Sequence, residues 1–191
     1  MASRRSRGKG SVLKYFDELK RTMEYLAEDP RTMFLGQAVA CKGTAMTNTV
    51  INIEDQRKLE MPVAEEMQMG ISIGLAMQGI VPVSFYPRWN FLLLAANQLI
   101  NHLDKLPLMS ENGFKTKVII RTSIGSERPL HPQHQHVGDF TDAFTLMCKN
   151  NIEVIRLDEP EYIFPAYQKA LTRKDGKSTL LVEWGDYYSE K

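Results

Sequence analysis

Short apolar runs that alternate with helical segments constrain the fold of this chain more than any other feature. Three of the runs read VIIR, EVIRL and TLLVEW, with little alternation of polar and apolar residues. Strands of this kind are buried on both faces, which is typical of parallel sheets covered by helices. The pattern therefore predicts a three-layer α/β/α fold with a mainly parallel central sheet.

The expected elements follow one another along the whole chain. Apolar residues at three- and four-residue spacings predict a first helix from Ser11, which ends at Asp29-Pro30 because proline disfavours helical geometry before it. The stretches 40–60 and 123–137 show no clear period, and a loop as long as the first is usually functional or contacts a partner. The remaining expected helices span 63–78, 89–106, 140–149 and 160–172, and the expected strands span 32–39, 81–86, 115–122, 153–157 and 179–184.

Length and composition indicate one ordinary domain. The chain has 191 residues, and its 24 Lys and Arg nearly balance its 23 Asp and Glu. We expect a single domain over 11–191, large enough to bury about 70% of its unfolded surface. Cys41 and Cys148 are far apart and form no CxxC pair, so we expect neither a disulfide framework nor a zinc site, and a cytoplasmic location. No apolar run is long enough to span a membrane.

The first ten residues, MASRRSRGKG, form a basic tail. They have no apolar core, so they are not a secretory signal. A disordered, solvated tail is the interpretation we favour, with part of a transit peptide or a nucleic-acid-binding arm as alternatives. Nucleic acid is not an expected partner, because so few cations bind phosphates weakly at physiological salt.

Residues 61–105 contain the densest set of candidate functional side chains. Glu65 and Glu66 lie in the first turn of an expected helix, where acids also complement the helix dipole. Gly70 and Gly74 share one face of that helix, although each glycine costs roughly 1 kcal/mol relative to alanine there. Such a face indicates close approach of another backbone, which belongs either to the chain's own sheet or to another subunit.

Four aromatic residues gather where an expected strand ends, namely Phe85, Tyr86, Trp89 and Phe91. Ligands of open α/β sheets bind at the carboxyl ends of the strands. The cluster could therefore stack against a flat heteroaromatic ring, although core packing is the commoner reason for aromatic residues.

Three of the four histidines lie in the irregular segment RTSIGSERPLHPQHQH, at His131, His134 and His136. No Cys, Asp or Glu stands at a standard zinc spacing around them, so we expect no metal site here. A catalytic or substrate-binding loop with one working histidine is the better interpretation. The sequence also lacks the signatures of a P-loop, a serine hydrolase and a Rossmann dinucleotide site.

Together these motifs resemble the pyrimidine-binding (Pyr) domain of thiamine diphosphate enzymes. The similarity is to the transketolase-like group, which includes the β subunits of 2-oxoacid dehydrogenase E1 components. It implies the thiamine diphosphate-binding fold of Pyr type, with thiamine diphosphate and Mg²⁺ as cofactors. The positions that carry the resemblance are Pro62-Val63-Ala64-Glu65, Gly70, Gly74, Gly79, Pro82, Asn90-Phe91, Gln98, Asn101 and Arg121 to Gln133-His134.

The resemblance also implies roles for individual residues. Glu65 matches the glutamate that hydrogen-bonds N1′ of the aminopyrimidine and activates the cofactor. Phe91 matches the aromatic residue that packs on this ring, with Trp89 close enough to help. His134 matches the active-site histidine, and further candidates for substrate contacts are His131, His136 and Gln37.

The chain departs from the family pattern at the substrate side. Gly36-Gln37-Ala38-Val39 replaces an acidic strand end, and Phe85 stands where an acid is common. We expect the chain to lack the C-terminal domain of the β subunits. The GDG…N signature, which binds Mg²⁺ and the diphosphate, is also missing, and the family has it in a separate PP-type domain.

The resemblance therefore implies one half of a two-component enzyme. We expect a PP-domain partner subunit in an α2β2 heterotetramer, and a small 2-oxo acid or ketose as substrate. The expected reaction is cleavage of a C–C bond next to a carbonyl, by a decarboxylase or an acyl or ketol transferase. The alternatives are a truncated E1 β-like subunit of a 2-oxoacid dehydrogenase and a non-catalytic regulatory or structural relative.

Overall fold

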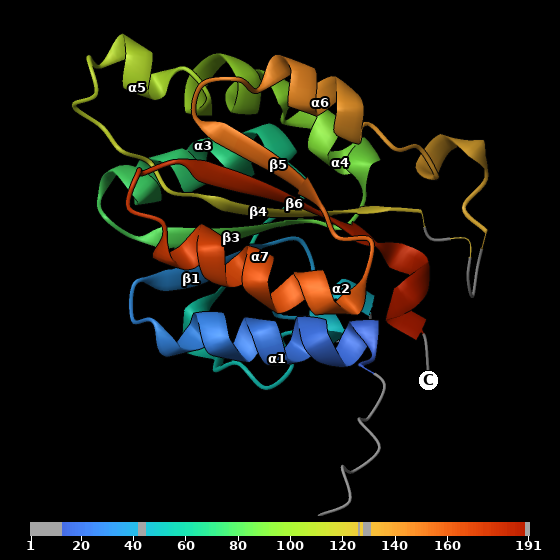
Figure 1. Ribbon diagram of the computed structural model, residues 1–191. Coiled ribbons are helices and arrows are strands. Elements are labelled where there is room, and N and C mark those ends of the chain that lie inside the picture. Colours follow the sequence, from blue (N-terminus) through green and yellow to red (C-terminus); the bar gives the residue numbers. More distant parts are fainter. Residues whose placement is uncertain (1–12, 42–44, 126, 128–130, 190–191) are drawn as a thin grey trace, which may run out of the picture.

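Six strands form one sheet between two layers of helices (Figure 1). The structure, a computed structural model, describes residues 13–41, 45–125, 127 and 131–189. The strand order is β2-β1-β3-β4-β6-β5, and every neighbouring pair is parallel. The predicted α/β/α architecture is therefore confirmed, whereas the basic tail 1–10 lies outside the described residues.

The strands end together along one side of the molecule, which we call the carboxyl edge. They are β1 (Thr32–Gly36), β2 (Lys58–Glu60), β3 (Val81–Tyr86), β4 (Ile119–Ile124), β5 (Ile152–Arg156) and β6 (Ser178–Trp184). The helices are α1 (Tyr15–Glu28), α2 (Ala45–Asn48), α3 (Glu65–Met77), α4 (Trp89–Leu94), α5 (Leu106–Met109), α6 (Thr141–Met147) and α7 (Pro160–Thr172). The shorter helical segments are the 3₁₀ turns η1 (Asp55–Arg57), η3 (His134–His136) and η4 (Gly185–Ser189) and the π-helix η2 (Gln98–Leu103).

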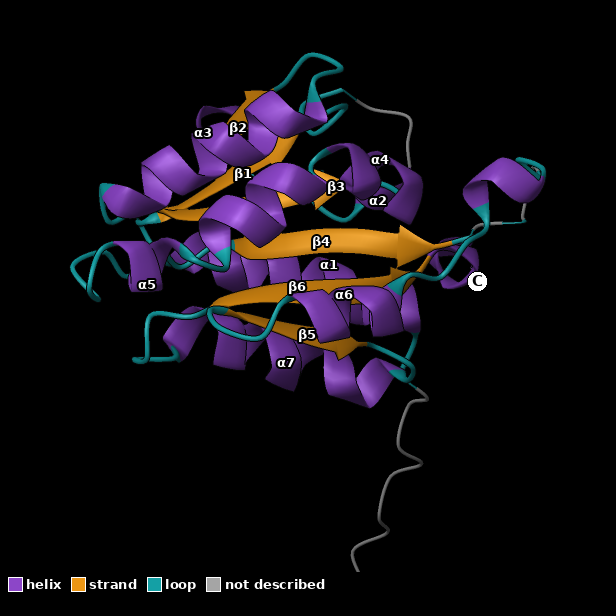
Figure 2. Cartoon of the chain, turned by 90° about the horizontal axis from the view of Figure 1, so that it is seen from above, coloured by secondary structure: helices purple, strands orange, loops and turns teal. Residues whose placement is uncertain are grey.

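Helices cover the sheet on two faces, which Figure 2 shows from above. On the α1 face, α1 and α7 pack side by side below the sheet in Figure 1. On the α3 face lie α3, α4, η2 and α6. No helix in the described ranges is both long and apolar enough to cross a membrane.

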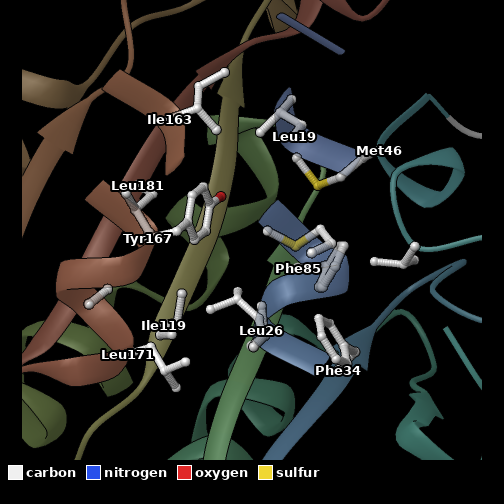
Figure 3. Packing of buried hydrophobic residues seen from close by; sticks show 14 of the residues in the cluster. Leu19, Leu26, Phe34, Met46, Phe85, Ile119, Ile163, Tyr167, Leu171 and Leu181 are labelled. Carbon is white, nitrogen blue, oxygen red and sulfur yellow. The ribbon is translucent and has the colours of Figure 1, made fainter. Parts of the chain in front are cut away.

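The predicted apolar stripe of the first helix is what buries α1. Tyr15, Leu19, Met23 and Leu26 are at most 1% exposed. Figure 3 shows this core, in which side chains of α1 and α7 meet those of the strands. Residues three and four apart share one helix face, so the sequence spacing was sufficient to orient this helix.

The sheet has one strand more than the sequence predicted. The missed strand, β2, lies within the stretch 40–60, which was expected to be irregular, and pairs with β1 at the sheet edge. Its three residues, Lys58–Glu60, are partly charged and give no apolar run. Short charged edge strands are common because they discourage pairing with other chains.

Several predicted elements have different bounds; for example, the expected strand 115–122 is β4 (Ile119–Ile124). The expected strand 32–39 ends at Gly36, because Ala38 adopts a left-handed φ of 55° and the Glu60 carboxylate accepts hydrogen bonds from the N–H groups of Ala38 and Ala40. The expected helix 89–106 is divided into α4, the π-helix η2 and the start of α5. Apolar spacing predicts the buried face of such a segment but does not fix its hydrogen-bond pattern.

Gly36 brings two strand ends together beneath the site. A Cβ at this position would lie 2.7 Å from Cβ and 2.8 Å from the carbonyl oxygen of Phe85 on β3. Only glycine permits this approach, and the next residue, Gln37, thereby reaches the start of α3.

Candidate functional site

Glu65 begins α3 and is 5% exposed. Nε2 of Gln37 donates a hydrogen bond to Oε1 of its carboxylate at 2.9 Å. The Tyr86 hydroxyl donates to the Glu65 carbonyl oxygen at 3.3 Å. Oε2 of Glu65 has no hydrogen-bond donor in the described part of the chain. The ends of β1 and β3 thus hold a buried carboxylate with one oxygen still available.

An open hollow lies beside this carboxylate, with a volume of about 830 Å³. Its wall is mostly apolar, and Glu65 is its buried acid. A flat ring with a polar edge suits such a wall, because the ring packs on apolar atoms while the carboxylate bonds the edge. The lining residues are Ala64, Glu65, Glu66, Met67, Gly70, Ile71, Leu94 and Gln98.

The glycines of α3 face away from the sheet. A Cβ added at Gly70 or Gly74 would have no atom within 4 Å outside its own helix. Packing on the chain's own sheet, one of the two interpretations of this pair, is therefore wrong. Val63 and Met67 beside them are 79% and 46% exposed. This open stripe of α3 offers a flat apolar surface for another backbone.

Glu66 lies at the rim of the hollow, in the first turn of α3. Its Oε1 accepts hydrogen bonds from Nδ2 of Asn97 at 3.2 Å and Nε2 of Gln98 at 3.5 Å. Asn97 in turn accepts from Asn101. Glu66 therefore complements the helix dipole, as predicted, and its hydrogen bonds also connect α3 to the start of η2.

Of the four aromatic residues at the end of β3, three belong to the core. Phe85, Tyr86 and Trp89 are at most 2% exposed. The Trp89 ring lies 4.9 Å from Phe144 and 6.2 Å from Phe140, measured between centroids. Core packing therefore explains these three residues, and Trp89 presents no free face to a ligand.

Phe91 is the member of this cluster that leaves the core. It is partly exposed, and the His136 ring stacks on it at 5.8 Å with an interplanar angle of 29°. His136 Nδ1 is buried without a hydrogen-bond partner in the described chain. The stack attaches the turn η3 to α4, so this part of the histidine loop lies beside the predicted cofactor-packing residue.

The three loop histidines have different surroundings. His131 accepts a hydrogen bond from the Gln133 N–H at Nδ1, and its Nε2 lies 3.5 Å from Glu127. His134 is exposed on η3. Among the described residues, no group of three His, Cys, Asp or Glu is arranged to hold a metal ion.

A buried ion pair lies on the α1 face, beneath the carboxyl edge. The guanidinium of Arg121 donates to both carboxylate oxygens of Glu183, at 2.7 and 3.0 Å, and both side chains are fully buried. The hydroxyls of Tyr167 and Tyr188 also donate to Glu183. Burial, and then the negative charge of Glu183, raise the pKa of both tyrosines well above its usual value.

This ion pair gives a physical account of Phe85, which stands where the family commonly has an acid. The Arg121 guanidinium lies 4.5 Å from the centroid of the Phe85 ring. Since Glu183 already neutralises this cation, the neighbouring position can carry a ring that stacks on it.

The arrangement of the strands and helices is found in solved transketolases. The transketolase from Campylobacter jejuni aligns with a TM-score of 0.71 and 16% identity, over 94% of this chain and 27% of that one. A structure described as a split-gene transketolase, an inactive β4 tetramer, aligns with a TM-score of 0.65 and 14% identity, over 91% and 52%. At such identities the likeness defines the fold alone.

The sequence comparison defines the family. The family described as "Transketolase, pyrimidine binding domain" matches residues 18–187. The chain therefore belongs to this family, whose enzymes depend on thiamine diphosphate, and the predicted resemblance is confirmed.

Curated relatives include E1 β subunits. Pyruvate dehydrogenase E1 component subunit beta-3, chloroplastic, of Oryza sativa subsp. japonica is 32% identical over 137 residues, which are 70% of this chain and 35% of the relative. The 2-oxoisovalerate dehydrogenase subunit beta of Bacillus subtilis is 30% identical over 119 residues, or 60% and 36%. The chain thus spans about a third of the length of these relatives.

Proposed function

We propose that this chain is the Pyr-type, β-like subunit of a two-component enzyme that uses thiamine diphosphate to cleave a C–C bond next to a carbonyl. The reaction is decarboxylation of a 2-oxo acid or transfer of an acyl or ketol group. The observation that carries the proposal is Glu65, a buried carboxylate that Gln37 holds by one oxygen at the wall of an open hollow.

The residues around this hollow fit the aminopyrimidine of the cofactor. When bound, thiamine diphosphate supplies a carbon nucleophile and an electron sink for the bond cleavage. Oε2 of Glu65 is the atom that would bond the pyrimidine edge and share its proton. Gln37 occupies Oε1 and so fixes the plane of the carboxylate. A carboxylate oriented in advance loses little entropy when it meets the ring.

The aromatic and histidine residues have supporting roles in this proposal. Phe91 packs against the pyrimidine, and Trp89 holds α4 in place through its contacts with α6 rather than touching the ring. His134, exposed on η3, handles protons on the substrate side. His131 and His136 remain candidates for substrate contacts, whereas Gln37, which was also a substrate candidate, acts on Glu65.

A partner subunit completes the site. The hollow is open and the stripe Val63, Met67, Gly70 and Gly74 is uncovered, so both require a second surface. We propose a PP-domain chain with GDG…N, which binds Mg²⁺ and the diphosphate, in an α2β2 heterotetramer. The cytoplasmic location stays a prediction, since three curated relatives are named as chloroplastic.

The names of the curated relatives favour one second candidate, an E1 β-like subunit of a 2-oxoacid dehydrogenase. It shares the cofactor chemistry and differs in the acceptor, a lipoyl group. A non-catalytic relative is less consistent with Glu65, because a scaffold has no use for a buried carboxylate that keeps a free oxygen.

The test is thiamine diphosphate binding and turnover by the chain co-purified with its PP-type partner. We expect Glu65→Gln to lower turnover by about 10²- to 10⁴-fold, the usual contribution of a positioned acid–base group. Glu161→Gln is the matched control, because Glu161 is an exposed acid in the first turn of α7, on the other face of the sheet.

Two results would overturn this proposal. Full turnover of the Glu65→Gln pair would remove the role given to Glu65. Full-affinity cofactor binding by this chain without any partner would remove the two-component site.

A further inference from the structure

Arg88 differs from the other arginines in the described ranges because its guanidinium has no partner. It makes no hydrogen bond and no ion pair with the residues that the structure describes. The others all donate hydrogen bonds: Arg21 to Glu18, Arg31 to Asp29, Arg57 to Thr32, Arg121 to Glu183, Arg156 to Asp158 and Arg173 to Asp175.

The Arg88 side chain is also partly withdrawn from water. Burial lowers the pKa of this guanidinium, and the charge of Asp186 opposes the effect only in part. The pKa of Arg31 and of Arg156 is raised instead, because each guanidinium donates hydrogen bonds to carboxylates. A cation that has lost hydration without gaining an acceptor is stabilised by any ligand that brings negatively charged oxygens.

Arg88 lies at the carboxyl edge, two residues beyond β3, near the middle of the sheet. The register pairs Gly36 with Phe85, so Gln37 lies level with Tyr86 on the neighbouring strand. Arg88 therefore follows directly on the strand end next to the Gln37–Glu65 pair. Ligands of open α/β sheets bind at this edge.

The backbone at Arg88 is fixed on both sides. The Ser123 hydroxyl at the end of β4 donates to the Pro87 carbonyl oxygen at 2.7 Å. The Phe91 N–H donates to the Arg88 carbonyl oxygen at 3.0 Å, where α4 begins. A fixed backbone with an unpartnered guanidinium is suited to ligand binding, because the fork of N–H donors can bond a carboxylate or phosphate in two places.

We propose that Arg88 binds an oxyanion of the substrate, a carboxylate or phosphate group remote from the reacting carbonyl. The substrate in this statement rests on the proposed function, whereas the anion site does not. The group must be remote because a cation that held the carboxylate about to leave would stabilise the ground state and slow its loss. The substrate class is therefore a 2-oxo dicarboxylic acid or a phosphorylated ketose.

The anion site is tested on the full chain alone, by the side-chain Nε–H signals of ¹⁵N-labelled arginine. Inorganic phosphate and acetate are titrated separately at constant ionic strength. We expect one signal, the one missing from Arg88→Gln, to shift and saturate with at least one of the two probes. Phosphate alone would identify a phosphate site and acetate alone a carboxylate site.

Arg31→Gln is the matched control, because Arg31 is an exposed arginine already paired with Asp29. Circular dichroism melting checks that each variant is folded. The proposal is overturned if the Arg88 signal does not respond, or if it shifts without saturation together with the other exposed arginines.

The link to the substrate is tested on the chain paired with its PP-type partner. Matched substrates differ only in the remote group, for example 2-oxobutanoate against 2-oxoglutarate and fructose against fructose 6-phosphate. We expect Arg88→Gln to reduce the preference in kcat/KM for the charged member by about 10- to 100-fold, the loss of a hydrogen bond to a charged group. Arg88→Lys should restore part of it.

The outcomes separate the two proposals. An unchanged preference in Arg88→Gln, or weaker partner binding without a change in preference, would overturn the substrate role. A pair that binds no thiamine diphosphate would overturn the proposed function instead, and the titration of the chain alone would still decide the anion site.

Discussion

On the α1 face, Arg121 and Glu183 are fully buried and form an ion pair with each other. Two tyrosine hydroxyls also donate hydrogen bonds to Glu183. On the α3 face, a Cβ added at Gly70 or Gly74 would meet no atom within 4 Å outside its own helix, and Val63 is 79% exposed. The first face is satisfied by the chain's own residues. The second exposes apolar atoms and flat backbone to water, which is what the proposed partner interface requires.

The largest expected effect lies on the satisfied face. Arg121→Met removes the cation and leaves Glu183 buried beside two tyrosines, so the free energy of unfolding should fall by about 3–5 kcal/mol. Urea denaturation of the full chain measures this. The double variant Arg121→Met/Glu183→Leu should recover most of the loss, because no unpaired charge remains. A single variant within 1 kcal/mol of wild type would contradict this account.

The second largest effect is expected from alkaline pH, which should lower the stability of the chain through its buried tyrosines. Burial is the main cause that raises the pKa of Tyr15 and Tyr167, and of Tyr86 on the α3 face. Unfolded tyrosine titrates near pH 10. Above that pH the unfolded chain loses protons that the folded chain keeps. The free energy of unfolding should therefore fall as pH rises, by up to about 1.4 kcal/mol per pH unit for each tyrosine, and be unaffected by them below pH 10.

Urea denaturation at pH 9, 10 and 11 measures this slope. Tyr167→Phe should reduce it by the contribution of one proton. An unreduced slope in that variant would show that other groups cause the loss.

A smaller effect of opposite sign is expected on the α3 face. Gly70→Ala and Gly74→Ala should each stabilise the lone chain by roughly 0.5–1 kcal/mol, because alanine favours a helix and its methyl group meets open space. Thermal denaturation measures the gain, and affinity for the partner measures the cost, since the methyl groups would separate the two backbones. If both variants destabilise the lone chain, the face is not open as described.

The smallest effect is expected from an exposed ion pair. Arg156 bonds Asp158 and Asp139 while its side chain is 41% exposed. Arg156→Met should therefore cost below about 1 kcal/mol, and less still at 1 M salt. Compared with Arg121→Met, this variant isolates what burial adds to an ion pair. Equal losses in the two variants would mean that burial adds nothing.

The sequence predicted those features that local spacing encodes. The stripe from Tyr15 to Leu26 and the apolar runs oriented α1 and most strands, since burial of one face leaves a period. Spacing could also have distinguished the buried Trp89 from the partly exposed Phe91. Trp89 shares a buried stripe with Leu92, Leu99 and Leu103, and Phe91 lies off it.

Contacts between residues that are far apart in the sequence produce no local pattern of this kind. Glu65 lies in the first turn of its helix as predicted, but its hydrogen bond with Gln37 joins positions 28 residues apart. Arg121 and Glu183 are 62 apart. Their pairing depends on strand order, which no local pattern records. Arg88 was missed, although a cation directly after an apolar strand is a signal that could have found it.

Tyr15 has a consequence for the synthesis of the chain. Its hydroxyl donates to the Leu157 carbonyl oxygen and accepts from the Trp184 N–H, 142 and 169 residues away. A ribosome that adds 5–20 residues per second needs roughly 10–30 s to travel that far. During that time the segments that bury the apolar stripe of α1 in the folded chain have not yet been made. The nascent chain therefore depends on chaperones, or on rapid burial of the stripe once β6 has emerged.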